Sequence, residues 1–184
     1  MKPRHIPNAL CILRMLLVAP LVLLLLEGQY QWVLLLFFTA GMTDGLDGFL
    51  AKRYDWRSRL GGVLDPLADK LLLVASFVTL GYVGLAPVWL LVAVVARDVV
   101  IIAGATAYRF LVEEFEANPT RVSKANSALQ LLYVLSAVAD AAYAVPGRPV
   151  VEVIGYAVLA TTVVSGVDYT VTWGQRAWTA RRAG

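Results

Sequence analysis

The sequence predicts an all-α, polytopic membrane protein with six transmembrane helices. Of its 184 residues, 59% are hydrophobic and only 16% are charged, and the mean hydropathy is +0.69. One soluble core of this length needs far fewer apolar side chains. The chain also divides into six apolar windows, each close to the roughly 20 residues that a helix needs to cross a hydrocarbon layer of about 30 Å.

Each window is bounded by turn residues or by charge, which gives the expected helices in order. The first follows the basic opening MKPRH and has no obvious small-residue cleavage site, so we expect a retained helix and not a cleaved signal peptide. Segments rich in Gly, Pro or charge, such as KRYDWRSR and VEEFEANPTR, separate the other windows. The expected helices lie near residues 9–26, 31–51, 61–83, 87–111, 122–144 and 151–173, and the chain 1–184 is expected to form one membrane domain.

The basic residues predict an orientation. With a cytoplasmic amino terminus, the outer loops hold only Arg148, whereas the inner segments hold Lys2, Arg4, Lys52, Arg53, Arg57, Arg59, Arg109, Arg121, Lys124, Arg176, Arg181 and Arg182. This is the positive-inside pattern, so both termini are expected on the cytoplasmic side. The net charge of +3 then describes an inner face suited to anionic lipid heads. Nucleic acid is not an expected partner, because no aromatic-rich soluble module is present.

Four aspartates lie at the ends of the second and third windows. In DGLDGFLAKRYDWRSRLGGVLDPLADK, Asp44 and Asp47 close the second helix, and Asp65 and Asp69 open the third on the same side of the membrane. At about 100° per residue, each pair lies on one helix stripe, and the two stripes can face each other. An ionised carboxylate inside the membrane costs roughly 2.5–3.5 kcal/mol, so a compensating positive charge is needed.

Oxygen ligands on two facing stripes are typical of sites for hard divalent cations such as Mg²⁺ or Mn²⁺. This stretch contains no His or Cys, which disfavours zinc. Its glycines would let a phosphate-bearing ligand approach the backbone closely. The alternative is that the aspartates pair with neighbouring basic residues and the glycines ease helix packing. Four aspartates on two matching faces favour the metal site.

The same stretch resembles the signature of the CDP-alcohol phosphotransferase family, DxxDGxxAR…GxxxDxxxD. It stands here as Asp44-Gly-Leu-Asp47-Gly48-Phe-Leu-Ala51-Lys52 and Gly61-Gly-Val-Leu-Asp65-Pro-Leu-Ala-Asp69. Lys52 occupies the position where the family usually has Arg, and Arg53 follows directly. Which of these two cations contacts phosphate stays open, because Lys lacks the planar fork of Arg. The resemblance covers the whole chain, since family members have a six-helix core with a site open to the cytoplasm.

The resemblance implies a role for each matching residue. Asp44, Asp47 and Asp65 would bind two divalent ions, Mg²⁺ or Mn²⁺, and Asp69 would both contact a metal and act as the general base. The CDP site would be lined by Gly48, Ala51, Lys52, Arg53 and Gly61, and by Asn8, which otherwise caps a helix. The implied reaction transfers a phosphatidyl group from CDP-diacylglycerol to an alcohol and releases CMP. A homodimer is a further expectation from the family.

The second half of the chain bears on the acceptor alcohol. RDVVIIAGATAYRF and NPTRVSKANSALQLL resemble the CMP-forming cardiolipin synthases, which use phosphatidylglycerol. Phosphatidylglycerophosphate synthases use glycerol 3-phosphate as the acceptor. They tend to show Arg-Glu and Lys-x-Lys-Thr at the positions of these two segments, and in this chain Asn126 stands in place of the second lysine. A phosphomonoester carries about −1.5 to −2 charges and calls for clustered cations, whereas Ser123, Lys124 and Asn126 suit a neutral glycerol head. Phosphatidylglycerol is therefore the favoured acceptor, with glycerol 3-phosphate as the alternative.

Arg97, near mid-membrane in the fourth window, has two interpretations. A charge at that depth marks a functional site by default, so Arg97 joins the expected acceptor-binding residues. Pairing with Asp168 or another buried acid explains it equally well.

A small ion transporter or channel is the alternative from another class, because intramembrane acids also mark ion pathways. A transporter or channel would have acidic residues at several depths of the bilayer, or interrupted helices near the midplane in two repeated halves of the chain. The four aspartates instead lie at one depth beside a basic segment. The sequence therefore favours an enzyme integral to a bacterial inner (cytoplasmic) membrane, with its active site facing the cytoplasm.

Overall fold

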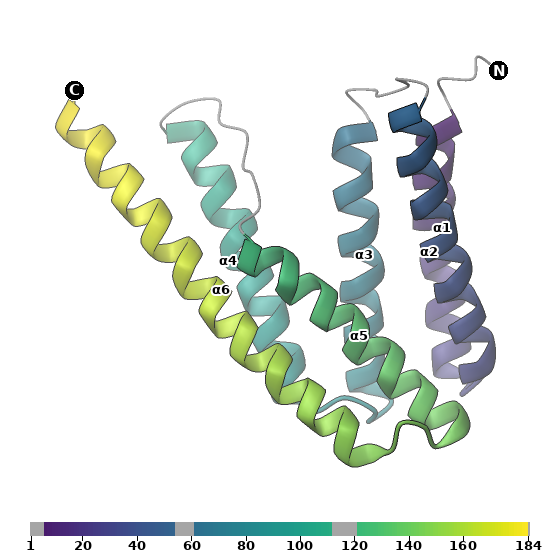
Figure 1. Cartoon of the computed structure of the whole chain (residues 1–184). Helices are drawn as coiled ribbons and strands as arrows, with labels where there is room; N and C mark the ends of the chain where they lie inside the picture. The colour runs from purple at the N-terminus through teal and green to yellow at the C-terminus, as the bar shows by residue number, and fades with distance from the viewer. Residues whose placement is uncertain (1–5, 54–60, 112–120, 184) are drawn as a thin grey trace. The chain divides into compact units, whose positions relative to one another are not determined.

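The computed structural model shows six α-helices (Figure 1). It describes the backbone of residues 6–53, 61–111 and 121–183, and the side chains of residues 11–43, 67–101, 103 and 122–171. The helices are α1 Ile6–Leu26, α2 Tyr30–Arg53, α3 Gly61–Tyr82, α4 Val88–Leu111, α5 Arg121–Tyr143 and α6 Arg148–Ala183. No strand occurs in these backbone ranges, so the expected all-α class is confirmed.

The last helix is longer than its apolar window. It begins at Arg148 and continues to Ala183, well beyond the expected end at residue 173. The window ended where the polar stretch GQRAWTARR begins. Gln, Arg and Ala are nevertheless good helix formers, and the main-chain hydrogen bonds of a helix need no apolar surroundings. Hydropathy therefore marked the apolar part of α6 and not the end of the helix.

Glycines in the left-handed conformation end α1 and α3. After α1, Gly28 has a φ of 73°; its N–H donates to Leu25 O (3.2 Å), and the N–H of Gln29 donates to Leu24 O (2.8 Å). Gly84 follows α3 with a φ of 78°. Glycine adopts this conformation without a steric cost and leaves the last helical carbonyls paired. The resulting tight turn sends α2 back along α1.

The chain forms two compact units. The first comprises residues Met1–Ala86 and Val134–Arg148, and in it α1 packs against both α2 and α3. The buried positions of α1 lie on one helix stripe; they are Cys11, Arg14, Leu21 and Leu25. The start of α1, the end of α2 and the start of α3 lie at the same end of this unit (Figure 1). The helix turns that carry the four aspartates therefore lie at the same end of the unit, as expected.

The second unit comprises residues Pro87–Tyr133 and Pro149–Gly184. It contains α4, the first part of α5 and α6. Here Gly155 of α6 allows close packing, because a Cβ atom at that position would lie 3.1 Å from Tyr133 Cε2 of α5. Leu90 of α4 packs at the same place, with its Cδ2 3.6 Å from that Cβ position. The missing side chain thus lets a tyrosine ring sit against the α6 backbone.

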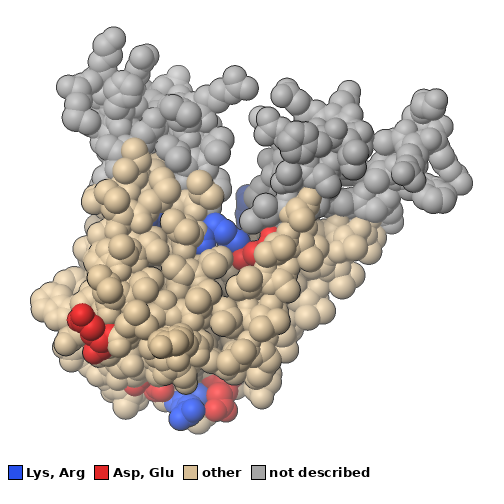
Figure 2. Space-filling model, turned by 180° about the vertical axis from the view of Figure 1, so that it is seen from behind, with Lys and Arg blue, Asp and Glu red and all other residues tan. Residues whose placement is uncertain are grey.

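Large apolar side chains occupy much of the described surface. Leu16, Phe38 and Val153 are each about two-thirds exposed, and charged side chains take up few places on the face in Figure 2. Such a surface is suited to lipid tails. Among the described residues, Arg148–Val171 has the length and composition of a membrane-crossing helix, and Cys11–Leu26 and Tyr30–Thr43 are shorter apolar stretches. The expected total of six spans stays a prediction.

Candidate active site

Asp69 is the member of the predicted aspartate set whose side chain the structure describes. Arg14 Nη1 of α1 donates a hydrogen bond to Asp69 Oδ1 of α3, at 2.5 Å. The Arg14 side chain is 1% exposed, whereas the Asp69 side chain is 53% exposed. Each residue lies eight positions after the first residue of its helix, which is about 12 Å along the helix axis. An ion pair therefore joins α1 to α3 at matching depth and leaves the carboxylate half exposed.

The other predicted site residues of this unit lie on described helices, but their side chains are outside the described set. They are Asn8 in α1, Asp44, Asp47, Gly48, Ala51, Lys52 and Arg53 in α2, and Gly61 and Asp65 in α3. Asp44 and Asp47 fall in the last three turns of α2, and Asp65 falls in the second turn of α3. The backbone thus supports the expected position of the two segments at one end of the first unit, and the role of each side chain stays a prediction.

The predicted ligands fit a hard divalent ion by their chemistry. They supply carboxylate oxygens, the donors that Mg²⁺ and Mn²⁺ prefer, and the Asp69 carboxylate is accessible because it is half exposed. Among the described side chains, no group of three His, Cys, Asp or Glu is placed to hold a metal ion, but three of the four aspartates lie outside that set. The metal site stays a prediction.

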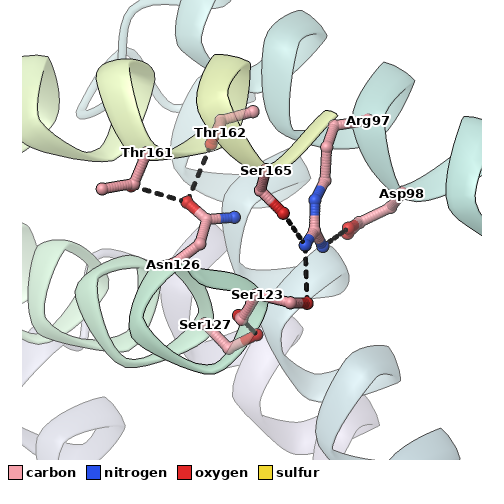
Figure 3. Close-up of polar contacts among 8 residues, drawn as sticks. All are labelled: Arg97, Asp98, Ser123, Asn126, Ser127, Thr161, Thr162 and Ser165. Atoms are coloured by element: carbon pink, nitrogen blue, oxygen red, sulfur yellow. Dashed lines mark hydrogen bonds and ion pairs between the residues drawn. The ribbon is translucent and has the colours of Figure 1, made fainter. Parts of the chain in front are cut away.

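The second unit contains a buried polar cluster around Arg97 of α4 (Figure 3). Arg97 Nη1 donates to Asp98 Oδ1 at 2.9 Å. Arg97 Nη2 donates to Ser123 Oγ of α5 at 2.7 Å and to Ser165 Oγ of α6 at 2.5 Å. The guanidinium carbon also lies 5.9 Å from the centre of the Tyr169 ring. One buried cation therefore connects three helices.

The acid that pairs with Arg97 is its neighbour, Asp98. Both side chains are buried, so the cluster contains a neutralised charge pair. Adjacent helical residues point about 100° apart, but the long arginine side chain spans that angle and reaches the carboxylate. The interpretation of Arg97 as the partner of a buried acid is confirmed, with Asp98 in place of Asp168. Ser165 was not predictable, since one serine in an apolar helix has no distinguishing pattern.

Asn126 of α5 is also fully buried. Its Oδ1 lies 2.8 Å from the hydroxyl of Thr161 and 3.0 Å from that of Thr162, both on α6 (Figure 3). Its Nδ2 has no hydrogen-bond partner among the described residues, and neither has the buried amide of Gln130 one turn further along α5. Asn126 thus helps to join α5 to α6 through polar contacts.

The four predicted acceptor-binding residues all lie in the second unit. Arg97, Ser123 and Asn126 are buried and make the contacts described above, whereas Lys124 is exposed. The structure brings Arg97 and Ser123 together directly. Acceptor binding by any of the four stays a prediction.

Asp98→Asn is expected to lower the free energy of unfolding by about 3–5 kcal/mol, because it leaves a buried guanidinium without its neutralising charge. Titration with SDS in mixed micelles measures this change. The matched control is Glu27→Gln, which removes an exposed carboxylate and should change stability by less than about 0.5 kcal/mol. Equal stability of the two variants would contradict the role of Asp98.

Comparison with known proteins places the chain in a family. Residues 4–167 match the family model described as CDP-alcohol phosphatidyltransferase, and this match covers most of the 184 residues. The chain therefore belongs to the CDP-alcohol phosphatidyltransferase family. The family is membrane-associated, transfers phosphatidyl groups from CDP-alcohols and generally uses a divalent metal.

Two mammalian relatives match over most of the chain. The human cardiolipin synthase (CMP-forming) is 34% identical over 183 residues, covering 91% of this chain and 61% of the relative. The rat cardiolipin synthase (CMP-forming) is 33% identical with the same coverage. This chain thus spans about three-fifths of the length of these relatives. The CDP-diacylglycerol–glycerol-3-phosphate 3-phosphatidyltransferase of Cereibacter sphaeroides is 38% identical over 94 residues, which cover 48% of this chain and 42% of the relative.

Proposed function

We propose that the chain is a metal-dependent enzyme that transfers a phosphatidyl group from CDP-diacylglycerol to phosphatidylglycerol, giving cardiolipin and CMP. The observation that carries this proposal is the position of the signature segments. The last turns of α2 and the first turns of α3 lie at the same end of the first unit (Figure 1), with the Asp69 carboxylate half exposed there.

Asp69 acts as the general base in this proposal. It takes the proton from the acceptor hydroxyl as the hydroxyl oxygen attacks the phosphorus of the phosphatidyl group. A new bond forms between that oxygen and phosphorus, the bond from phosphorus to the CMP oxygen breaks, and CMP leaves. A carboxylate that is half exposed can meet a substrate hydroxyl without movement of a covering segment.

The predicted ligands of two divalent ions, Mg²⁺ or Mn²⁺, are Asp44, Asp47, Asp65 and Asp69. When bound, the ions would neutralise charge on the pyrophosphate. The CDP moiety would be held by Gly48, Ala51 and Gly61, by Asn8, and by one of the two cations Lys52 and Arg53. The small residues leave room for a phosphate close to the helix backbone.

The acceptor assignment is supported by the identity of the full-length matches. The two cardiolipin synthases are 34% and 33% identical over 91% of the chain, whereas a probable phosphatidylglycerophosphate synthase of Mycobacterium tuberculosis is 29% identical over 90% of it. In the proposed site, exposed Lys124 contacts the single-charge phosphodiester of phosphatidylglycerol. The buried contacts of Arg97, Ser123 and Asn126 hold the start of α5 against its neighbours in the second unit.

The membrane arrangement belongs to the same proposal. All six helices cross the bilayer, both termini lie in the cytoplasm, and the aspartate end of the first unit faces the cytoplasm of a bacterial cell. The exposed apolar side chains and the one-sided distribution of Lys and Arg support this arrangement. The homodimer stays a prediction from the family resemblance.

Asn126→Lys is expected to reduce cardiolipin formation at least about tenfold without a matching gain in the use of glycerol 3-phosphate. The substitution buries an ammonium beside two threonine hydroxyls, and a buried unpaired charge costs several kcal/mol. The matched control is Ala125→Lys, since residue 125 is exposed; it should retain cardiolipin formation. Product analysis with each acceptor checks both variants. A switch of Asn126→Lys to efficient use of glycerol 3-phosphate would instead make this position the selector of the acceptor.

The proposed acceptor is tested with the purified protein in detergent micelles containing CDP-diacylglycerol and Mg²⁺. Phosphatidylglycerol and glycerol 3-phosphate are supplied in separate reactions, and the lipid product of each is identified. Cardiolipin from phosphatidylglycerol is the expected product. Phosphatidylglycerophosphate from glycerol 3-phosphate, with no cardiolipin from phosphatidylglycerol, would show that the acceptor is wrong and that the glycerol-3-phosphate alternative holds.

A further inference from the structure

The ion pair between α1 and α3 is asymmetric. The buried member is the cation, Arg14, and the half-exposed member is the carboxylate, Asp69. The other buried positions on the same stripe of α1 are apolar or nearly so: Cys11, Leu21 and Leu25. Burial of a guanidinium carries a desolvation cost that is offset only by a well-placed partner, and an apolar side chain of similar volume often stabilises a fold as well or better.

Stability alone therefore gives a poor account of Arg14. A half-exposed carboxylate stays solvated without a partner, so Asp69 itself does not require the contact to be stable. The contact instead restrains Asp69. The guanidinium is held by its burial, and its Nη1 lies 2.5 Å from Asp69 Oδ1. The contact with this buried donor thus limits the orientations that the half-exposed carboxylate can adopt.

We propose that Arg14 is a positioning residue for Asp69, and that it holds the carboxylate in the orientation that accepts the proton of the acceptor hydroxyl. This inference rests on the proposed function, in which Asp69 is the base.

The test is a double-mutant cycle of CMP release with Arg14→Met, Asp69→Asn and the double variant. Methionine buries no charge, and the half-exposed Asp69 is not left as a buried unpaired charge, so this variant should fold. Asp69→Asn removes the charge that neutralises buried Arg14 but keeps an oxygen acceptor for it, and size-exclusion profiles check the fold of every variant. Mn²⁺ binding, followed by electron paramagnetic resonance, is measured on the same preparations. Leu21→Met is the matched control, since it lies on the same stripe of α1 and makes no polar contact with Asp69.

Arg14→Met is expected to lower kcat about 10- to 100-fold, because misplacement of a catalytic group by about 1 Å has an effect of this size. The KM for CDP-diacylglycerol and the Mn²⁺ affinity should change less than about threefold, because the ion pair between Arg14 and Asp69 orients the base and does not bind the substrate or the metal ion. In the Asp69→Asn background, Arg14→Met should have no further effect. Arg14→Lys keeps the positive charge and should retain part of the activity. If Arg14→Met does not fold, the same double-mutant cycle with Arg14→Lys tests whether Arg14 positions Asp69.

Three results would overturn the inference: wild-type kcat in Arg14→Met, an equal loss from Arg14→Met in both backgrounds, or a loss of Mn²⁺ affinity in parallel with activity. If the wild-type chain turns over, such a result removes the positioning role and leaves the proposed function in place. If the wild-type chain releases no CMP, both are wrong.

Discussion

Asp47→Asn is expected to lower CMP release about a thousandfold or more while the detergent-solubilised protein stays folded. An asparagine at this position removes one negative oxygen ligand from the predicted metal site, and a bound metal supplies several kcal/mol of charge stabilisation in the transition state. The same outcome is expected for Asp44 and Asp65. CMP release, Mn²⁺ affinity and size-exclusion profiles are the measurements.

Asp140→Asn is the matched control for these variants. Asp140 lies outside the predicted site, and its Oδ1 accepts a hydrogen bond from the N–H of Gly147 at 3.0 Å. An asparagine keeps that acceptor, so turnover should be unchanged. Wild-type turnover and wild-type Mn²⁺ affinity in Asp47→Asn would remove Asp47 from the metal site.

Asp69→Asn is expected to lower kcat by about 10²–10⁴-fold, the range that a general base contributes. The loss would be larger if a metal contact is lost as well. Binding of CDP-diacylglycerol should survive better than turnover, because the amide cannot take a proton but occupies the same space. Single-turnover kinetics and a binding assay with labelled CDP-diacylglycerol separate the two effects. Unchanged turnover in this variant would exclude Asp69 from the mechanism.

The helices were predictable because apolar windows, turn glycines and charge all marked the same boundaries. Gly28 and Gly84 end helices through the backbone geometry that only glycine adopts readily. The end of α6 was not predictable from hydropathy, since its last turns are polar but still contain good helix formers. A hydropathy window detects the apolar part of a helix, so it does not show where a helix with polar last turns ends.

The signature segments and their position at one end of the first unit were also predictable, since two antiparallel helices joined by a short polar segment place their joined ends on the same side. The pairing of Arg14 with Asp69 was not. The available signal was a single arginine inside an apolar helix. That signal indicates a buried partner, but periodicity within one helix does not tell which other helix supplies it.

The buried polar contacts of the second unit were only partly predictable from the sequence. The family pattern predicts Asn126 and Ser123 as acceptor-binding residues, and the structure shows both buried in contacts between helices. Thr161, Thr162 and Ser165 supply the other half of these contacts and carried no pattern of their own. Partners in a polar contact between helices are set by helix rotation and depth, which one sequence does not fix.

Metal-dependent phosphatidyl transfer is tested most directly by the release of CMP from CDP-diacylglycerol before and after removal of divalent ions. The purified chain is assayed with phosphatidylglycerol as purified, after treatment with a chelator, and after addition of Mg²⁺ to the treated sample. The expected result is one CMP for each cardiolipin formed, loss of both products after chelation, and recovery of both with Mg²⁺. Undiminished CMP release from the chelator-treated, metal-free protein would contradict a metal site formed by the aspartates of α2 and α3.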